Sequence, residues 1–213
     1  MRWIGQELLG HPQALIVREV GFLKPLPTIG SANQQGDEGA GTDREIGRID
    51  MILVHPDVHQ QLRWCAVEKQ AVYFSGEAMD NEFQAIATQL DDALPFPAKN
   101  HRPDYRSSGP KRLLPQLQTK VADIRRWGKR MAVVVDVSFF GALAQMEFER
   151  SISNADIAWF VVCFEDTSPS AKLSADGVYF TRLEAAVQGL TGGRALSQDE
   201  FEARILRKLD LIP

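Results

Sequence analysis

The chain has 213 residues, of which 44% are hydrophobic and 24% charged, and its formal net charge is −4. This length and balance are typical of a single globular domain, here residues 1–213, that buries its own core. The two cysteines are too few for a four-cysteine metal site, and the apolar runs are shorter than the roughly 18–20 residues that span a bilayer. These features exclude membrane, disulfide-scaffold and coiled-coil classes, and we expect a cytoplasmic protein with reduced thiols.

The first half of the chain predicts a helix, a long loop and a β-hairpin. Residues 3–9 fit a short helix, and residues 14–17 fit a short strand or buried turn. Residues 25–45 are rich in Gly, Pro, Ser and Asn without apolar periodicity, which is typical of a loop. Residues 46–54 and 63–74 have the composition of two strands with a short polar link, which favours a hairpin. Alternation along the first strand places one set of side chains on the same face: Ile46, Arg48, Asp50 and Ile52.

Two helices are predicted next. An amphipathic stripe over residues 79–93 predicts a helix that ends before Pro95, with four side chains on its buried face: Phe83, Ile86, Ala87 and Leu90. A second helix is predicted over residues 113–127, with Gly128 as its stop. Its inner face would carry Leu117, Val121 and Ile124. Its exposed face would carry Lys120, Arg125 and Arg126.

The remaining elements complete an α/β pattern. Near-continuous apolar runs over residues 131–137 and 157–164 predict strands that are buried on both faces. A capping box over residues 197–200 predicts a final amphipathic helix, with Phe201, Ile205 and Leu209 on one stripe. The order of elements therefore predicts an α/β fold with a mixed central β-sheet flanked by helices.

Positive charge is concentrated in one segment. Residues 99–130 contain ten basic residues and only two acidic ones, although the whole chain is acidic. Such a segment is either the contact surface for a polyanion such as DNA or simply a solvated helix face and loop.

Two carboxylates lie in the strands of the predicted hairpin. If the hairpin brings Asp50 beside Glu68, the two like charges repel in a partly buried site unless a cation joins them. Mg²⁺ suits such a pair because it prefers oxygen ligands and retains waters or phosphate oxygens. Gln70 lies on the same strand face as Glu68, whereas Lys69 points to the other face. The alternative is that both acids face solvent at a sheet edge or pair with nearby arginines.

Three segments resemble one family of nucleases. Asp50 followed by Glu68-Lys69-Gln70, within the string VEKQAVYFSG at residues 67–76, resembles the PD-(D/E)xK nuclease core with Gln in place of the usual Lys. Together with residues 102–113 and 126–136, it is similar to the NotI-type restriction endonucleases. The resemblance covers about residues 46–165 and implies a restriction-endonuclease-like fold.

The resemblance also implies a mechanism and partners. Asp50 and Glu68 would hold Mg²⁺ with the main-chain carbonyl of Lys69, and Gln70 would orient the attacking water or touch the scissile phosphate. The protein would cut duplex DNA as a homodimer, with Glu7 of the first helix as a further candidate acid. The residues expected to contact DNA are Arg102, Tyr105, Arg106, Lys111 and Arg112. The type enzyme also carries a four-cysteine iron site, which two cysteines cannot build, so its target sequence cannot be transferred.

Three other functions remain open at this stage. The same fold could serve a repair, recombination or phage-borne nuclease. It could also be a catalytically inactive DNA-binding module, because Gln70 can act neither as a general base nor as a cation. A small-molecule α/β enzyme is a further alternative, although the sequence has no glycine-rich nucleotide-binding fingerprint.

Overall fold

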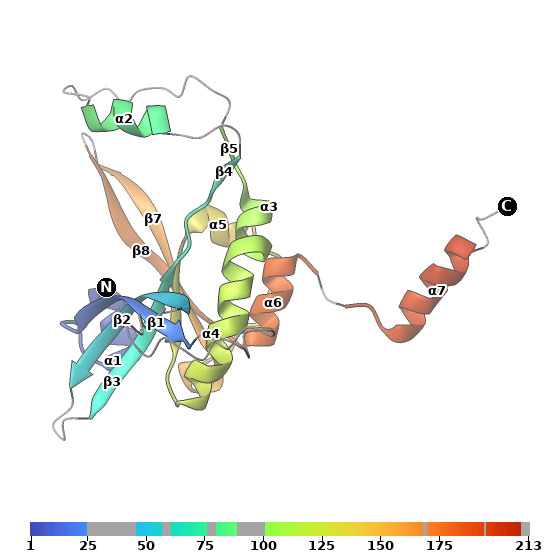
Figure 1. Cartoon of the computed structure of the whole chain (residues 1–213), viewed down its shortest axis with the longest axis horizontal. Coiled ribbons are helices and arrows are strands. Elements are labelled where there is room, and N and C mark those ends of the chain that lie inside the picture. The colour runs from blue at the N-terminus through green and yellow to red at the C-terminus, as the bar shows by residue number, and fades with distance from the viewer. Residues whose placement is uncertain are drawn as a thin grey trace, which may run out of the picture.

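A six-stranded mixed sheet forms the centre of the computed structural model (Figure 1). The structure describes residues 1–24, 46–56, 61–75, 80–88, 101–167, 170–193 and 195–209. The strand order is β1-β2-β3-β6-β7-β8, and only the β3–β6 and β6–β7 pairs are parallel. The strands are β1 (Leu15–Leu23), β2 (Ile46–Pro56), β3 (Leu62–Lys69), β6 (Met131–Asp136), β7 (Ile157–Thr167) and β8 (Ser170–Thr181). The predicted mixed α/β sheet is confirmed.

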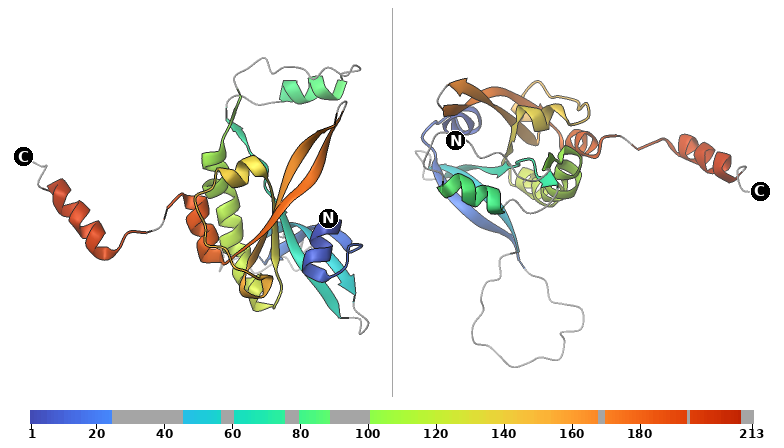
Figure 2. Two further views of the ribbon diagram at one scale, coloured as in Figure 1. Left: turned by 180° about the vertical axis from the view of Figure 1, so that it is seen from behind. Right: turned by 90° about the horizontal axis from the view of Figure 1, so that it is seen from above.

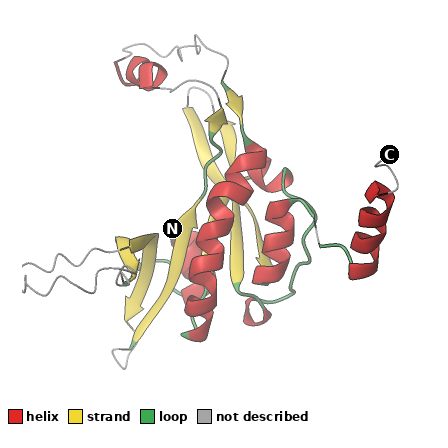
Figure 3. Cartoon of the chain, turned by 45° about the vertical axis from the view of Figure 1, so that its right-hand side comes forward, coloured by secondary structure: helices red, strands yellow, loops and turns green. Residues whose placement is uncertain are grey.

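Helices cover both faces of this sheet. The helices beside the sheet are α1 (Arg2–Leu9), α4 (Leu114–Arg126), α5 (Val137–Gly141) and α6 (Leu183–Thr191). The buried residues of α4, α5 and α6 share one core with the sheet, and α1 packs into a second core on the other side. Figures 2 and 3 show this arrangement, with α4 and α6 side by side on one face. Residues 65–68 of β3, 131–133 of β6 and 157–161 of β7 are nearly inaccessible, as predicted for β6 and for the first half of β7. Phe164, which was also predicted to be buried, exposes 70% of its surface.

Smaller elements extend from this body. A two-stranded ribbon, β4 (Phe74–Ser75) with β5 (Arg102–Pro103), leads to α3 (Tyr105–Ser108) and a π-helical turn, Gly109–Leu113, that continues into α4. The other helices are α2 (Asp80–Thr88), α7 (Gln198–Leu209) and a 3₁₀ turn, Ile152–Asn154. None of the helices in the described part of the chain is long and apolar enough to cross a membrane.

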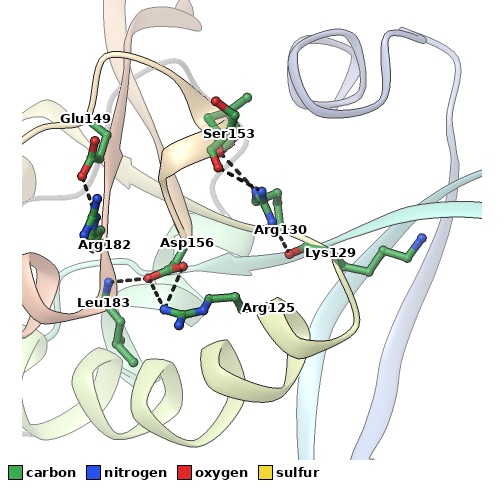
Figure 4. A network of polar contacts seen from close by, with 9 residues as sticks. Arg125, Lys129, Arg130, Glu149, Ser153, Asp156, Arg182 and Leu183 are labelled. Carbon is green, nitrogen blue, oxygen red and sulfur yellow. Dashed lines mark hydrogen bonds and ion pairs between the residues drawn. The ribbon is translucent and has the colours of Figure 1, made fainter.

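A polar network fixes α4 and α6 to the start of β7 (Figure 4). The buried Asp156 accepts a hydrogen bond from the main-chain N–H of Leu183, the first residue of α6, at 3.0 Å. Arg125 near the end of α4 contacts the same carboxylate at 3.4 Å. The residue that precedes α6, Arg182, makes no side-chain cap, so Asp156 caps this helix from a distant part of the chain.

Several predicted boundaries are wrong. The strand expected at residues 14–17 extends to Leu23, and the strand expected to run to residue 74 ends at Lys69. The predicted buried stripe of α2 is not part of the core, since Phe83 exposes 62% of its surface and Ala87 is exposed. β8 and α6 were not predicted, and the loop expected at residues 25–45 lies outside the described residues.

The cysteines carry no disulfide. Both Cys65 and Cys163 are free, as expected, but only Cys65 is fully buried. Burial raises the pKa of the Cys65 thiol to about 12, so this thiol stays protonated at neutral pH and acts as a packing residue.

Candidate functional site

The β2–β3 hairpin brings the two predicted carboxylates together. The antiparallel register pairs Met51 with Val67, so the next position along the strands sets Asp50 against Glu68. The main-chain N–H of Lys69 donates a 2.9 Å hydrogen bond to Oδ2 of Asp50. The main-chain N–H of Asp50 in turn hydrogen-bonds the Glu68 carboxylate. The expected juxtaposition of the two acids is therefore present.

The regular alternation predicted for β2 fails at Asp50. Ile49 and Ile52 belong to the same core, on the α4 side of the sheet, whereas Met51 belongs to the core on the α1 side. The irregularity coincides with Glu19 on the neighbouring strand, which has a left-handed φ of 53°. A local distortion of this kind changes which face a side chain occupies and is frequent beside active sites.

Glu68 is buried against a lysine from α4. Glu68 exposes 2% of its surface and Lys120 exposes 4%. The Lys120 ammonium donates a 2.6 Å hydrogen bond to Oε1 of Glu68, and it also donates to the carbonyl of Arg48 and to Oε1 of Gln116. The prediction that Lys120 lies on the exposed face of its helix is wrong, because the ion pair supplies the partner that a buried charge requires.

The protonation of Glu68 reflects this environment. Burial is the largest effect and raises the pKa of the Glu68 carboxyl above its ordinary value. The hydrogen bond and charge of Lys120 lower this pKa, and the nearby charge of Asp50 raises it. The repulsion from Asp50 is the electrostatic condition that favours a bound cation.

Gln70 follows Glu68 on the same side of the sheet and is also buried, with 7% exposure. Its main-chain N–H donates to the carbonyl of Val134 on β6, which continues the parallel ladder beyond the end of β3. Its side-chain amide donates a 2.6 Å hydrogen bond to the carbonyl of Ala71. Lys69 is exposed, in agreement with its predicted position on the opposite face.

Glu7 does not join these residues. It lies on the exposed surface of α1, and the buried side chains of that helix contact the core on the side of the sheet opposite α4. The first-helix acid considered from the sequence is therefore not part of this site.

The basic segment is attached directly to the strand extension that carries Gln70. The main-chain N–H of Asp104 donates to the carbonyl of Tyr73, and the N–H of Tyr73 donates to the hydroxyl of Ser108. Asp104 caps α3 by accepting hydrogen bonds from the main chain and hydroxyl of Ser107, which lower the pKa of Asp104. The Arg112 guanidinium lies 3.3 Å from the centre of the Tyr73 ring.

The predicted DNA contacts occupy different environments. Arg102, Lys111 and Arg112 are exposed, whereas Tyr105 is half-buried and the Arg106 side chain lies outside the described part of the chain. Tyr105 lines a cavity of about 530 Å³ at the carboxyl end of β6, together with hydrophobic neighbours that include Val72, Phe74 and Phe164. The predicted DNA contacts therefore do not share one environment and do not form a single cluster.

The residues at the centre suit a hard cation. Asp50 and Glu68 offer carboxylate oxygens from neighbouring strands, which are the ligands that Mg²⁺ prefers. Among the described residues, no group of three or more His, Cys, Asp and Glu side chains could hold a metal. Further ligands would have to come from the main chain, from water or from a substrate phosphate. Mg²⁺ is commonly bound in this way, by one or two carboxylates together with waters and phosphate oxygens.

Comparison with known families identifies the wider group. The model of the family described as restriction endonuclease NotI matches residues 1–175. The chain belongs to this family. Restriction endonucleases cut DNA, so membership of this family implies that the protein is a DNA-cleaving enzyme with DNA as its partner. None of the curated proteins compared with the chain matches it. The resemblance inferred from the sequence is thus confirmed, and the match ends within β8.

The contact between α4 and the carboxylate site, through Lys120, was not predicted from the sequence. Leu117, Val121 and Ile124 were correctly predicted to face the core, and all three are buried. At 100° per residue, position 120 lies on the same arc of the helix as these three. The spacing therefore contained the signal for a buried Lys120, which the usual association of lysine with the surface obscured.

Proposed function

We propose that the protein is a Mg²⁺-dependent endodeoxyribonuclease with a PD-(D/E)xK-type core that hydrolyses duplex DNA. The observation that carries the proposal is the position of Asp50 beside the buried Glu68 on neighbouring strands. These two residues would hold the ion, and Gln70 would orient water or the phosphate. The bound ion would supply Lewis-acid stabilisation and lower the pKa of a coordinated water.

The reaction is the addition of water across one phosphodiester linkage. A bond forms between the water oxygen and phosphorus, the bond from phosphorus to one sugar oxygen breaks, and that oxygen takes up a proton. No oxidant, reductant or second substrate is needed. The contribution of the protein is positioning and electrostatic stabilisation of the charge that develops on the phosphate oxygens.

The basic segment would hold the DNA. The exposed Arg102, Lys111 and Arg112 follow the strand extension that carries Gln70, so a duplex contacting them would pass close to the two carboxylates. Tyr105 and Arg106 belong to the same segment and complete the proposed contact surface. We also propose a homodimer, since two-fold symmetric DNA sites favour two-fold symmetric proteins, and a cytoplasmic location.

The experiment is digestion of long, unmodified genomic DNA by the purified protein in Mg²⁺, Mn²⁺ or EDTA. Discrete fragments that require the metal would support a sequence-specific restriction enzyme. A metal-dependent smear would support a less selective nuclease, whereas cleavage that requires a branch, an end or a lesion would support a role in repair or recombination. Cleavage in EDTA would contradict the proposed metal dependence. The absence of cleavage on several DNAs of different sequence would contradict the proposed nuclease activity.

A further inference from the structure

The strongest unexplained feature of the site is a buried ammonium group. Lys120 reaches from α4 to the sheet and directs its three donors at Glu68, the carbonyl of Arg48 and Gln116. An ammonium group has three N–H donors, and the contact with Gln116, at 3.2 Å, is the longest of the three. The side chain is therefore held in one place, although it comes from a helix far along the chain.

The strand itself provides no positive charge on this face. Gln70 has a neutral amide whose N–H₂ is engaged with the carbonyl of Ala71, and the neighbouring Lys69 is exposed on the opposite face. Hydrolysis of a phosphodiester adds negative charge to the phosphate oxygens in the transition state. Charged donors aimed at such oxygens in a site shielded from water are a large part of catalysis.

We propose that Lys120 is a catalytic residue, whose ammonium group exchanges its long contact with Gln116 for an oxygen of the scissile phosphate and supplies the positive charge that Gln70 cannot supply. This inference rests on the proposed nuclease function. The ammonium group lies 2.6 Å from Oε1 of Glu68, and Gln70 is the next residue on the same strand face, about 6.5–7 Å further along the backbone. The helix thus replaces a strand lysine in the same small region.

A purely structural role explains this arrangement less well. A buried ion pair is seldom more stabilising than apolar residues of the same volume, because both charges lose their hydration. Retaining two charges at this position is reasonable if the charges themselves are needed for the reaction.

The test is to move the positive charge from the helix to the strand. Lys120→Gln removes the charge, Gln70→Lys adds one, and the double variant exchanges the two side chains. The control is Arg204→Gln, which removes one positive charge from an exposed side chain of α7, outside the basic segment. Each protein is measured for cleavage rate at saturating DNA, for Mn²⁺ affinity by calorimetry without DNA, and for thermal unfolding.

We expect Lys120→Gln to cut at least ~100-fold more slowly than the parent, because a transition-state donor is lost. Its Mn²⁺ affinity is expected to be unchanged or tighter, because a cation next to Glu68 has been removed. Gln70→Lys in that background is expected to raise the cleavage rate again by at least ~10-fold, whereas Arg204→Gln cuts like the parent. A structural role instead predicts that metal affinity falls with cleavage and that the exchange restores nothing.

The results separate this inference from the proposed function. If the parent cuts but the folded double variant is no faster than Lys120→Gln, the role of Lys120 is wrong and the nuclease function stands. If the parent does not cut with any metal, the function itself fails. Should the double variant not fold, Lys120→Arg decides the question, because the charge is retained there and cleavage must exceed that of Lys120→Gln.

Discussion

At the residue scale, the site contains a pair of carboxylates that the sequence predicts and a lysine–glutamate contact that it does not predict. Asp50 and Glu68 could be paired in advance, since a hairpin with a short link brings such positions together. The partner of Lys120 could not be predicted with the same ease, because Glu68 is 52 residues away in the sequence. Contacts between a helix and a distant strand depend on packing, which local periodicity does not determine.

The buried ion pair has a consequence for stability. Glu68→Leu leaves the Lys120 ammonium buried without its charged partner, and we expect a loss of about 3–5 kcal/mol in the free energy of unfolding. The double variant Glu68→Leu/Lys120→Met removes both charges and is expected to unfold within about 1 kcal/mol of the parent or above it. Urea unfolding, monitored by circular dichroism, measures the free energy of unfolding of the single and the double variant. Equal destabilisation of the single and double variants would show that the pair is not coupled in this way.

At the scale of elements, the central strands and α4 were predictable from the sequence, whereas the edge strand β8 and the helix α6 were not. The apolar runs of β6 and β7 have the composition of strands buried on both faces, and residues 131–133 and 157–161 have that position. β8 is an edge strand with an irregular pairing opposite Val161 and Val162 and with mostly exposed or half-exposed residues, so its sequence lacks a clear period. α6 depends on a cap from Asp156, a partner that the local sequence of the helix does not contain.

The distant cap predicts a specific loss. Asp156→Ala removes the acceptor for the first N–H of α6 and the partner of Arg125, and we expect a loss of about 1–2 kcal/mol in unfolding free energy. Arg125→Gln is the matched control and should cost less, because the Arg125 side chain is 61% exposed. Thermal unfolding of the two variants compares them directly. A larger loss for Arg125→Gln would mean that the ion pair, and not the helix cap, is the important contact.

At the scale of the whole molecule, α7 is separate from the body. The capping box predicted at its start is present, since Ser197 and Glu200 exchange hydrogen bonds. The predicted amphipathic helix is present, but no residue of α7 is buried. Phe201 and Leu209, on its apolar face, expose 58% and 55% of their surface. Figure 1 shows the helix extending away from the sheet. Helix formation was predictable from the sequence, whereas the absence of a packing partner within the described chain was not.

Removal of α7 should leave the folded body intact. A chain that ends at Gly193 keeps the glycine cap of α6 and loses no buried side chain of the sheet or of the helices on it, so we expect its melting temperature to lie within about 2 °C of the parent. Differential scanning calorimetry of the two proteins at several concentrations measures this. A decrease that depends on concentration would indicate instead that α7 stabilises an assembly of several chains.

The most direct test of the central claim is the single-turnover cleavage rate of Asp50→Asn and Glu68→Gln in Mg²⁺. Both changes preserve size and remove one negative charge, and Asp199→Asn, on the exposed first turn of α7, is the matched control. We predict a loss of at least ~100-fold for each site variant, no change for the control, and DNA binding in EDTA that is at least as tight as in the parent. Cleavage at the parent rate by either site variant would contradict the assignment of these two carboxylates to the metal.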